Sequence, residues 1–336
     1  MEKEKIEIIA EIGSVHDGSF GNACRLIELA SECGATTVKF QTHISDAETT
    51  RSAPSPSYFS SENRFDYFKR TAFSESQWKS LKNRTEDLGL GFLSSPFSLE
   101  AVDLLENIGV SAFKIPSGEV TNLPLLEKLA VLERKVWISS GMSDWNELDS
   151  AVELLKSGRC ETGVMQCTSL YPCPPQKVGF NIIQEMKSRY GIPVGFSDHT
   201  SEIYAAIASV CLGVAAIEKH LTFSKKMYGS DAANSLEPDQ FLSMTRGIRE
   251  VEHIVSNPVD KSDMTQFAEM KDVFQKSIVA ARDLKVGERI SLDDLSFKKP
   301  GIGVSAAEYK DFLGRRLKAS KKEDEFIYFE DLEGDE

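Results

Sequence analysis

Two histidines, His199 and His220, carry the clearest chemical signal in the sequence, because each ends a short apolar stretch that resembles a β-strand. At strand periodicity, Ser197 shares a face with His199, and Glu218 shares a face with His220. If the two strands are neighbours, about 4.8 Å apart, both imidazoles can bind one ion. A single histidine is more often a hydrogen-bonded core residue, but two at matching depth favour a metal site. Two imidazoles with oxygen ligands suit Mn²⁺ best, with Mg²⁺ or Co²⁺ as alternatives, whereas catalytic zinc usually takes three protein ligands.

Serines and lysines end the other apolar stretches and form a second candidate site. Hydroxyl and ammonium groups that converge can bind a phosphate or a carboxylate. Serine also punctuates ordinary strand-to-helix turns, and for any one serine that explanation is the simpler one. A whole set of such residues, in a chain whose surface is otherwise acidic, predicts a phosphorylated small anion as ligand. The set is Ser95, Ser117, Ser139, Ser169 and Ser197, with Lys39 and Lys114.

Eight short β-branched stretches recur along the chain, and helical periodicity lies between them. This alternation predicts a parallel sheet, and eight repeats favour a closed (β/α)8 (TIM) barrel over an open doubly wound sheet. In such a barrel the residues at the carboxyl-terminal strand ends face the active site. The predicted strands are Ile6–Gly13, Thr36–His43, Gly91–Phe97, Ser111–Ser117, Lys135–Ser140, Gly163–Ser169, Ile192–His199 and Val214–Leu221.

Two regions depart from this repeat. Ser45–Thr71 is an insertion rich in Ser, Pro and aromatic residues, and long loops of this kind usually are lids or binding loops. We therefore predict a barrel of residues 1–255, a polar linker of residues 256–274 and a small C-terminal domain of residues 275–336. That domain is marginal alone and is expected to dock on a barrel, its own or a partner's. Its predicted strands are Ser277–Ala281, Leu295–Lys299 and Glu325–Phe329.

The composition excludes several classes of protein. Of the 336 residues, 41% are hydrophobic and 27% are charged, as in ordinary soluble proteins. A formal net charge of −13 argues against nucleic acid or an anionic membrane as a partner. No stretch approaches the roughly 20 apolar residues of a membrane span, and the first apolar run is unlike a signal peptide. The six cysteines show no zinc-like spacing, so we expect reduced thiols and a cytoplasmic location.

These residues resemble the sialic acid (nonulosonic acid) synthase family, in order and over nearly the whole chain. The resemblance implies a TIM barrel joined to an antifreeze-like (SAF) domain, in a domain-swapped homodimer. It also implies the condensation of phosphoenolpyruvate with an N-acyl amino sugar. The matching segments are Ala10–Gly13, Val38–His43, Ser94–Ser98, Phe113–Glu119, Ser139–Met142, Gln166–Pro172, Gly195–Thr200, Ile217–His220 and Lys298–Gly303.

By that resemblance, the binding and catalytic roles fall on single residues of this chain. His199 and His220 hold the divalent ion that polarises the sugar aldehyde, Lys114 is shared by binding and catalysis, and Glu119 deprotonates the attacking water. The phosphate of phosphoenolpyruvate is bound by Lys114, Ser117, Ser139, Ser169 and Ser197, and its carboxylate by Lys39 and Ser95. The sugar is bound by Glu11, Gln41, Tyr171 and Asp231, and by Lys299 from the partner copy.

Three positions depart from the family pattern and concern mainly the sugar. Ser169 and Val15 each stand where an asparagine is expected, and Lys299 stands where an arginine is expected. Lysine keeps the charge but loses the bidentate fork of arginine. N-acetylmannosamine is the first choice of substrate, which makes the product N-acetylneuraminate. A 2,4-diacetamido-trideoxyhexose, the precursor of legionaminic or pseudaminic acid, is the second choice.

Two other functions compete with this prediction. Related synthases condense phosphoenolpyruvate with a phosphorylated aldose, but the antifreeze-like tail and the lack of a second basic cluster argue against that reaction. A non-catalytic sugar-binding module would not need the lysines, Glu119 and both histidines together.

Overall fold

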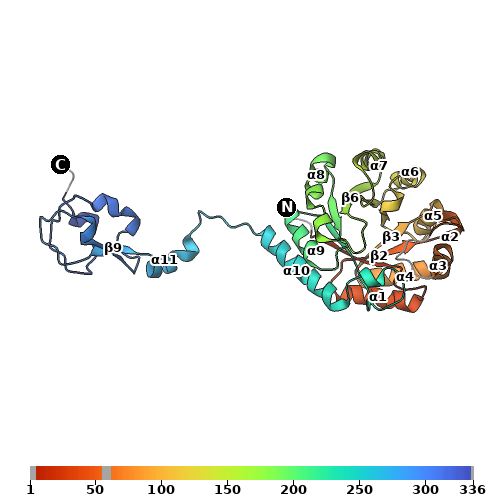
Figure 1. Ribbon diagram of the computed structural model, residues 1–336, viewed down its shortest axis with the longest axis horizontal. Coiled ribbons are helices and arrows are strands. Elements are labelled where there is room, and N and C mark those ends of the chain that lie inside the picture. Colours follow the sequence, from red (N-terminus) through yellow and green to blue (C-terminus); the bar gives the residue numbers. More distant parts are fainter. Residues whose placement is uncertain (1–4, 55–61, 334–336) are drawn as a thin grey trace. The chain divides into compact units, whose positions relative to one another are not determined.

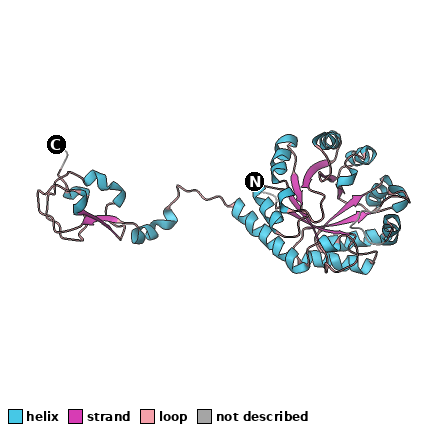
Figure 2. Cartoon of the chain, viewed as in Figure 1, coloured by secondary structure: helices cyan, strands magenta, loops and turns pink. Residues whose placement is uncertain are grey.

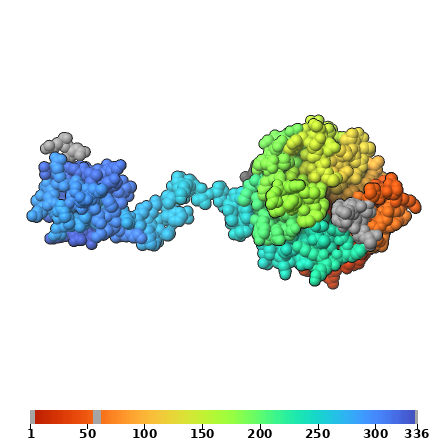
Figure 3. Space-filling model, viewed as in Figure 1, coloured from red at the N-terminus to blue at the C-terminus, as the bar shows by residue number. Residues whose placement is uncertain are grey.

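The structure is a computed structural model that describes residues 5–54 and 62–333. The chain forms two compact units, Met1–Asn257 and Pro258–Glu336, and each is a closely packed body (Figures 1 and 3). Within the described residues, no helix is both long enough and apolar enough to cross a membrane. All six cysteines are free thiols.

The first unit is a closed barrel of eight parallel strands in sequential order, which confirms the predicted TIM-barrel fold (Figure 2). The barrel closes between the first and last strands, where Glu11 pairs in register with His220. The strands are β1 (Glu7–Gly13), β2 (Thr37–Thr42), β3 (Gly91–Pro96), β4 (Ala112–Ile115), β5 (Lys135–Ser139), β6 (Glu161–Cys167), β7 (Val194–Ser197) and β8 (Ala216–His220).

Helices cover the outside of the barrel and bury one apolar stripe each. The helix α1 shows the rule, since its buried residues Ala23, Leu26, Ile27 and Ala30 follow helical spacing. Capping boxes begin three of these helices, at Ser74 for α4, at Asp144 for α7 and at Glu237 for α10. The main helices are α1 (Phe20–Glu32), α4 (Glu75–Asp87), α5 (Leu99–Asn107), α6 (Leu123–Ala130), α7 (Trp145–Ser157), α8 (Phe180–Tyr190), α9 (Tyr204–Ser209) and α10 (Pro238–Ser256).

The amino-terminal end of the barrel interior is filled by an apolar cluster, here called the barrel floor. Trp137 is its largest member, and Gly163 on the next strand leaves the space that the indole occupies, because an added Cβ would overlap the ring. Residues two positions further along each strand face the same interior, one layer closer to the carboxyl-terminal mouth. The floor consists of Ile9, Leu93, Trp137, Met165 and Ala216.

The insertion after β2 is more ordered than its predicted loop character suggested. It contains two helices, α2 (Ser45–Glu48) and α3 (Arg64–Thr71). Its aromatic residues Phe65, Tyr67 and Phe68 are buried rather than presented to solvent, so they stabilise the insertion against the barrel. The part of the insertion at residues 55–61 lies outside the described residues.

The second unit begins with the predicted polar linker, which includes helix α11 (Ala268–Phe274). Strands β9 (Ser277–Ala280) and β10 (Leu295–Lys298) form an antiparallel pair. The predicted strand Glu325–Phe329 is wrong, since the structure has only an isolated bridge between Val279 and Phe326 there. A 3-10 turn begins at Phe329, with Asp331 accepting from the backbone N–H of Tyr328, and this ends any extended run.

Candidate active site

The polar residues of the barrel meet at the carboxyl-terminal mouth, one layer above the floor. The strand-end side chains are buried although they are polar or charged, which costs free energy unless each has a partner. Those that are less than a tenth exposed include Glu11, Lys39, Ser95, Lys114, Ser139, Ser197, His199, Glu218 and His220.

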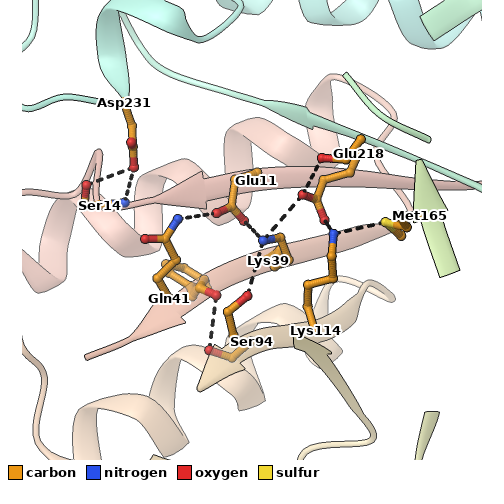
Figure 4. A network of polar contacts seen from close by, with 12 residues as sticks. Glu11, Ser14, Lys39, Gln41, Ser94, Lys114, Met165, Glu218 and Asp231 are labelled. Carbon is orange, nitrogen blue, oxygen red and sulfur yellow. Dashed lines mark hydrogen bonds and ion pairs between the residues drawn. The ribbon is translucent and has the colours of Figure 1, made fainter. Parts of the chain in front are cut away.

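Four of these buried side chains form an alternating row of charges, here called the charged quartet (Figure 4). Lys39 Nζ lies 3.1 Å from Glu11 Oε2 and 3.5 Å from Glu218 Oε1. Lys114 Nζ lies 2.9 Å from Glu218 Oε2. Glu218 therefore bridges the two lysines that the sequence assigned to phosphoenolpyruvate, and the quartet is neutral when all four groups are charged.

Burial and mutual attraction shift the titration of the charged quartet in opposite directions. Although burial opposes ionisation, Lys114 and Lys39 lower the pKa of Glu218, which stays a carboxylate. Burial and the nearby Glu218 raise the pKa of Glu11 to about 7, against the pull of Lys39. Glu11 therefore carries a proton for part of the time near neutral pH.

Three of the predicted phosphate ligands lie together in the structure and are here called the serine cluster. The hydroxyl of Ser117 lies 3.0 Å from that of Ser139 and 3.1 Å from that of Ser169. Gly141 borders the cluster, and a Cβ at this position would lie 2.6 Å from Ser117 Oγ and closer still to Ser169 Oγ. The glycine therefore leaves open the space that the three hydroxyls face.

The other two predicted serines contact the charged quartet instead. Ser95 Oγ lies 3.4 Å from Lys39 Nζ, as expected for a shared carboxylate site. Ser197 donates to Glu218 Oε1 at 3.0 Å and lies 3.5 Å from His199 Nε2. Ser197 therefore links the lysines to the histidine pair.

Three of the predicted sugar ligands gather on the β1 and β2 side of the mouth. Gln41 Nε2 donates to Glu11 Oε1 at 2.7 Å, and the N–H and hydroxyl of Ser14 both donate to Asp231 Oδ2 at 2.9 Å (Figure 4). Gly13, at a φ of +53°, lies between them, because a Cβ there would collide with Asp231 and lie 3.2 Å from Gln41 Nε2. These contacts place Glu11, Gln41 and Asp231 around one small space.

The two histidines face each other at the mouth, with ring centroids 5.9 Å apart. His199 Nδ1 donates to the Thr168 carbonyl at 3.0 Å, which leaves the lone pair on Nε2. Tyr171 donates its hydroxyl to that Nε2 at 3.1 Å and stacks on the ring. His220 Nδ1 is buried and has no hydrogen-bond partner among the residues that the structure describes.

Glu119 lies in the 3-10 turn Ser117–Glu119, beside the serine cluster, and is half-buried. Asn122 Nδ2 donates to its Oε2 at 2.7 Å. Burial and the neighbouring Glu48 raise the pKa of Glu119 above that of an ordinary carboxyl group. Lys299 belongs to the second unit, where its Nζ lies 5.0 Å from the centre of the Phe274 ring.

Comparison with known proteins decides the family. The NeuB family model matches residues 26–260, and the SAF domain model matches residues 275–333. The chain belongs to the NeuB family. The predicted resemblance and the predicted SAF domain are thereby confirmed.

Relatives of this NeuB chain match along its whole length. An uncharacterized protein of Methanocaldococcus jannaschii is 39% identical over 98% of this chain and 95% of its own length. The N,N'-diacetyllegionaminic acid synthase of Campylobacter jejuni is 36% identical over 96% of this chain and 99% of its own length. The crystal structure of the N-acetylneuraminic acid synthetase of Leptospira borgpetersenii, in complex with citrate, superposes with a TM-score of 0.71. It is 27% identical and covers 81% of this chain and 93% of that one.

The sequence did not assign a role to two residues of the NeuB site. Glu218 shares the inward face of its strand with His220, and this periodicity was the only signal of its place between the lysines. Cys167 lies with its sulfur 3.7 Å from His199 Nδ1. Burial alone would raise the pKa of the Cys167 thiol, but His199 and Lys114 lower it to about 7.

Proposed function

We propose that the chain is a phosphoenolpyruvate-dependent nonulosonic acid synthase that uses a divalent metal ion. The observation that carries the proposal is the serine cluster at the barrel mouth, close to two buried lysines that are already paired with carboxylates. Such a set of hydroxyl and ammonium donors suits a small molecule with a phosphate at one end and a carboxylate at the other. Phosphoenolpyruvate has that pattern of charges.

Each end of phosphoenolpyruvate has its own donors in this proposal. Ser117, Ser139 and Ser169 donate to the phosphate, and Lys39 with Ser95 binds the carboxylate. Lys114 and Ser197 complete the phosphate site, and Glu218 holds both lysines in place while keeping them charged. The lysines cannot move far from Glu218, so the substrate meets a site that is already organised.

The histidine pair fits a divalent ion with few protein ligands. His220 Nδ1 is buried without a hydrogen-bond partner among the described residues, and the backbone contact of His199 leaves the lone pair on Nε2, which would coordinate the ion in place of accepting from Tyr171. No cluster of three or more metal-binding side chains is found within residues 5–54 and 62–333, and in this proposal water and substrate would supply the remaining ligands. This donor set favours Mn²⁺, with Mg²⁺ and Co²⁺ as alternatives, and the bound ion would polarise the sugar aldehyde.

The residues of the chain then perform three tasks in the reaction. The serine cluster and the lysines orient phosphoenolpyruvate so that its C3 attacks the aldehyde carbon. A water molecule adds to the cation left at C2, and Glu119 accepts the proton of that water. Collapse of the tetrahedral intermediate releases inorganic phosphate, which the serine cluster and Lys114 stabilise as its charge grows.

The open-chain sugar is held by Glu11, Gln41, Tyr171 and Asp231. The sequence favoured N-acetylmannosamine, with N-acetylneuraminate as product. The Campylobacter relative named as an N,N'-diacetyllegionaminic acid synthase favours instead a 2,4-diacetamido-trideoxyhexose. Both sugars carry the N-acyl group and the aldehyde that the site requires.

The second unit supplies the last sugar contact in this proposal. Lys299 reaches the site of a second copy of the chain in a domain-swapped homodimer, where it contacts the N-acyl group. The free thiols of all six cysteines are consistent with a cytoplasmic enzyme. Removal of residues 275–336 should therefore weaken sugar binding, and a fully active monomeric barrel would refute this arrangement.

A phosphate-release assay tests the proposal. The purified chain is given phosphoenolpyruvate, each of the two sugars in turn, and Mn²⁺, Mg²⁺ or Co²⁺. We expect phosphate release that depends on both sugar and metal, and no release with His220→Ala, with His253→Ala on the exposed end of α10 as the control. Unchanged turnover by His220→Ala would contradict the metal assignment, and no turnover with either sugar would contradict the function.

A further inference from the structure

His43 is a buried histidine that the proposed reaction does not use. It follows β2 directly and is 8% exposed. Its ring is clamped between two aromatic rings, that of Phe68 at 3.6 Å with an interplanar angle of 18° and that of Phe97 at 4.1 Å with an angle of 20°. Phe68 comes from α3 of the insertion, and Phe97 follows β3. The clamp fixes the plane of the imidazole.

Both nitrogens of His43 face oxygen atoms. Nδ1 lies 2.8 Å from Glu48 Oε1, and Nε2 lies 3.2 Å from Gln41 Oε1. Glu48 is held in turn, because its Oε2 accepts from the backbone N–H of Ile44 at 3.1 Å and its side chain is only 3% exposed. Donation to both oxygens requires a proton on each ring nitrogen, that is, an imidazolium paired with the Glu48 carboxylate. In that form Nε2 donates to Gln41 from a position that the insertion determines.

These contacts give the Gln41 amide one orientation. An amide can turn over at little steric cost, since its oxygen and nitrogen are similar in size. Here the oxygen accepts from His43 while the nitrogen donates to Glu11 Oε1 at 2.7 Å, and a flip would turn the amide N–H groups against the Nε2–H of His43. The cavity that borders Gln41 and His43 measures about 10 Å³, which is about the space of one water molecule.

We propose that His43 is a positioning residue that presents the Gln41 amide to the sugar, and that the insertion holds His43 through Glu48 and Phe68. Without the Nε2 donor, the amide would occupy both orientations, and only one of them offers the sugar the correct donor. The inference that this affects sugar binding rests on the proposed function, whereas the positioning of Gln41 does not.

The test uses His43→Phe, which keeps an aromatic ring in the clamp and removes both N–H groups. We expect the KM for the sugar to rise about 10-fold, the size of one lost hydrogen bond, with the KM for phosphoenolpyruvate unchanged. In a Gln41→Ala background, His43→Phe should have no further effect on the sugar KM, because it acts only through Gln41. His253→Phe, at an exposed site, is the matched control.

A second readout does not depend on turnover. The side-chain amide of Gln41 is assigned in the NMR spectrum of ¹⁵N-labelled protein by its absence from Gln41→Ala. We expect one sharp pair of resonances in the wild type and a shifted or exchange-broadened pair in His43→Phe. Glu48→Gln, which keeps an acceptor for His43 but removes the charge, should shift the same pair to a smaller extent and serves if His43→Phe does not fold.

The two readouts separate the possible failures. A Gln41 amide pair that is unchanged in both variants would overturn the positioning role, whatever the activity. Equal loss of sugar and phosphoenolpyruvate affinity, or additive effects with Gln41→Ala, would also overturn it, because a general structural defect acts in that way. If the wild type turns over neither sugar while the amide pair responds, the proposed function fails and the positioning role stands.

Discussion

The proposed phosphoenolpyruvate side of the site and its proposed sugar side differ in how far each depends on segments outside the barrel strands. On the first side, Lys114 and Ser139 lie within strands, and Ser117 and Ser169 lie within two residues of a strand end. On the second side, Glu11 and Gln41 also lie within strands, but Asp231 lies in the segment after β8, and His43 depends on an insertion between β2 and α4. The two sides meet at Glu11, which contacts both Lys39 and Gln41.

The difference suggests how one family can keep its reaction and change its sugar. Strand residues share the cooperative stability of the barrel, so the donors to phosphoenolpyruvate cannot move without disturbing the core. Loops and insertions tolerate substitution better, and binding specificity is commonly located there. Changes on the phosphoenolpyruvate side should therefore affect catalysis with every sugar, and changes on the sugar side should affect the choice among sugars.

The largest effect is expected from Lys114→Met. The substitution removes a phosphate donor and one of the two cations that compensate Glu218, so kcat/KM should fall about 10³-fold with either sugar. Phosphate release measures the loss. The double variant Lys114→Met/Glu218→Gln should recover thermal stability without recovering activity, whereas a recovery of both would mean that Lys114 acts only in folding.

Glu119→Gln is expected to lower kcat about 10²-fold, the lower range for loss of a general base. The base works as a carboxylate, and its pKa is raised by burial and Glu48, so wild-type activity should fall as the pH drops through a value above 4.5. The residual activity of Glu119→Gln should lack that acid limb. An acid limb that persists unchanged would point to another group, such as Glu11, whose pKa is raised to about 7.

Gly141→Ala tests the phosphoenolpyruvate side by filling the space beside the serine cluster. The new methyl group would overlap Ser169 Oγ and lie 2.6 Å from Ser117 Oγ, so the hydroxyls must move. We expect the KM for phosphoenolpyruvate to rise about 30-fold, below the 10²-fold that a 1 Å misplacement can cost. The sugar KM should not change. Gly118→Ala is the control, because its methyl group meets only Met142 at 3.6 Å.

Gly13→Ala makes the corresponding change on the sugar side. Its methyl group would collide with Asp231 and approach Gln41, so the sugar KM should rise about 10-fold while the KM for phosphoenolpyruvate stays the same. Gly109→Ala is the control for the backbone strain that any alanine has at positive φ. Gly109 has a φ of +75°, and its added methyl group would meet no atom within 4 Å. If Gly13→Ala and Gly141→Ala raise the same KM, the two sides are not separate.

The smallest effect is expected from Lys299→Ala. Lysine cannot make the two parallel hydrogen bonds of an arginine guanidinium, so Lys299 would contribute a single exposed contact to the sugar. Its loss in Lys299→Ala should raise the sugar KM only about 3-fold. Lys299→Arg should lower the sugar KM if the residue contacts the N-acyl group of a sugar in the partner's site. Identical sugar KM values for all three proteins would remove Lys299 from the site.

Much of this architecture could be predicted from the sequence, because it depends on local patterns. The eight β-branched stretches became eight strands, and the period of two placed Lys39 and Gln41 on one inward face. Contacts across the barrel could not be predicted in the same way. Glu218 meets Lys39 and Lys114, which belong to strands that are not its neighbours, so their meeting depends on the diameter of the closed barrel.

The insertion shows the other limit of sequence patterns. His43 had no feature that distinguished it from an ordinary core histidine, and its role became visible only when Phe68 and Glu48 were placed around it. Phe68 lies 25 residues further along the chain, within a segment that the composition described as a loop. Helix α3 formed there because its buried aromatic face packs on the barrel, which outweighs the polar composition.

The barrel floor fills the interior below the polar residues, so a substrate would reach them from the carboxyl-terminal mouth. Lys39 lies directly above the floor, and Gln41 lies one layer nearer the opening on the same strand. The substrate that binds at the depth of Lys39 must therefore enter before the substrate that binds at the depth of Gln41. Phosphoenolpyruvate, whose carboxylate would bind to Lys39, would therefore precede the sugar. The indole of Trp137 lies far from the reacting atoms. By filling the floor of the barrel, it would nevertheless set the order in which the two substrates bind.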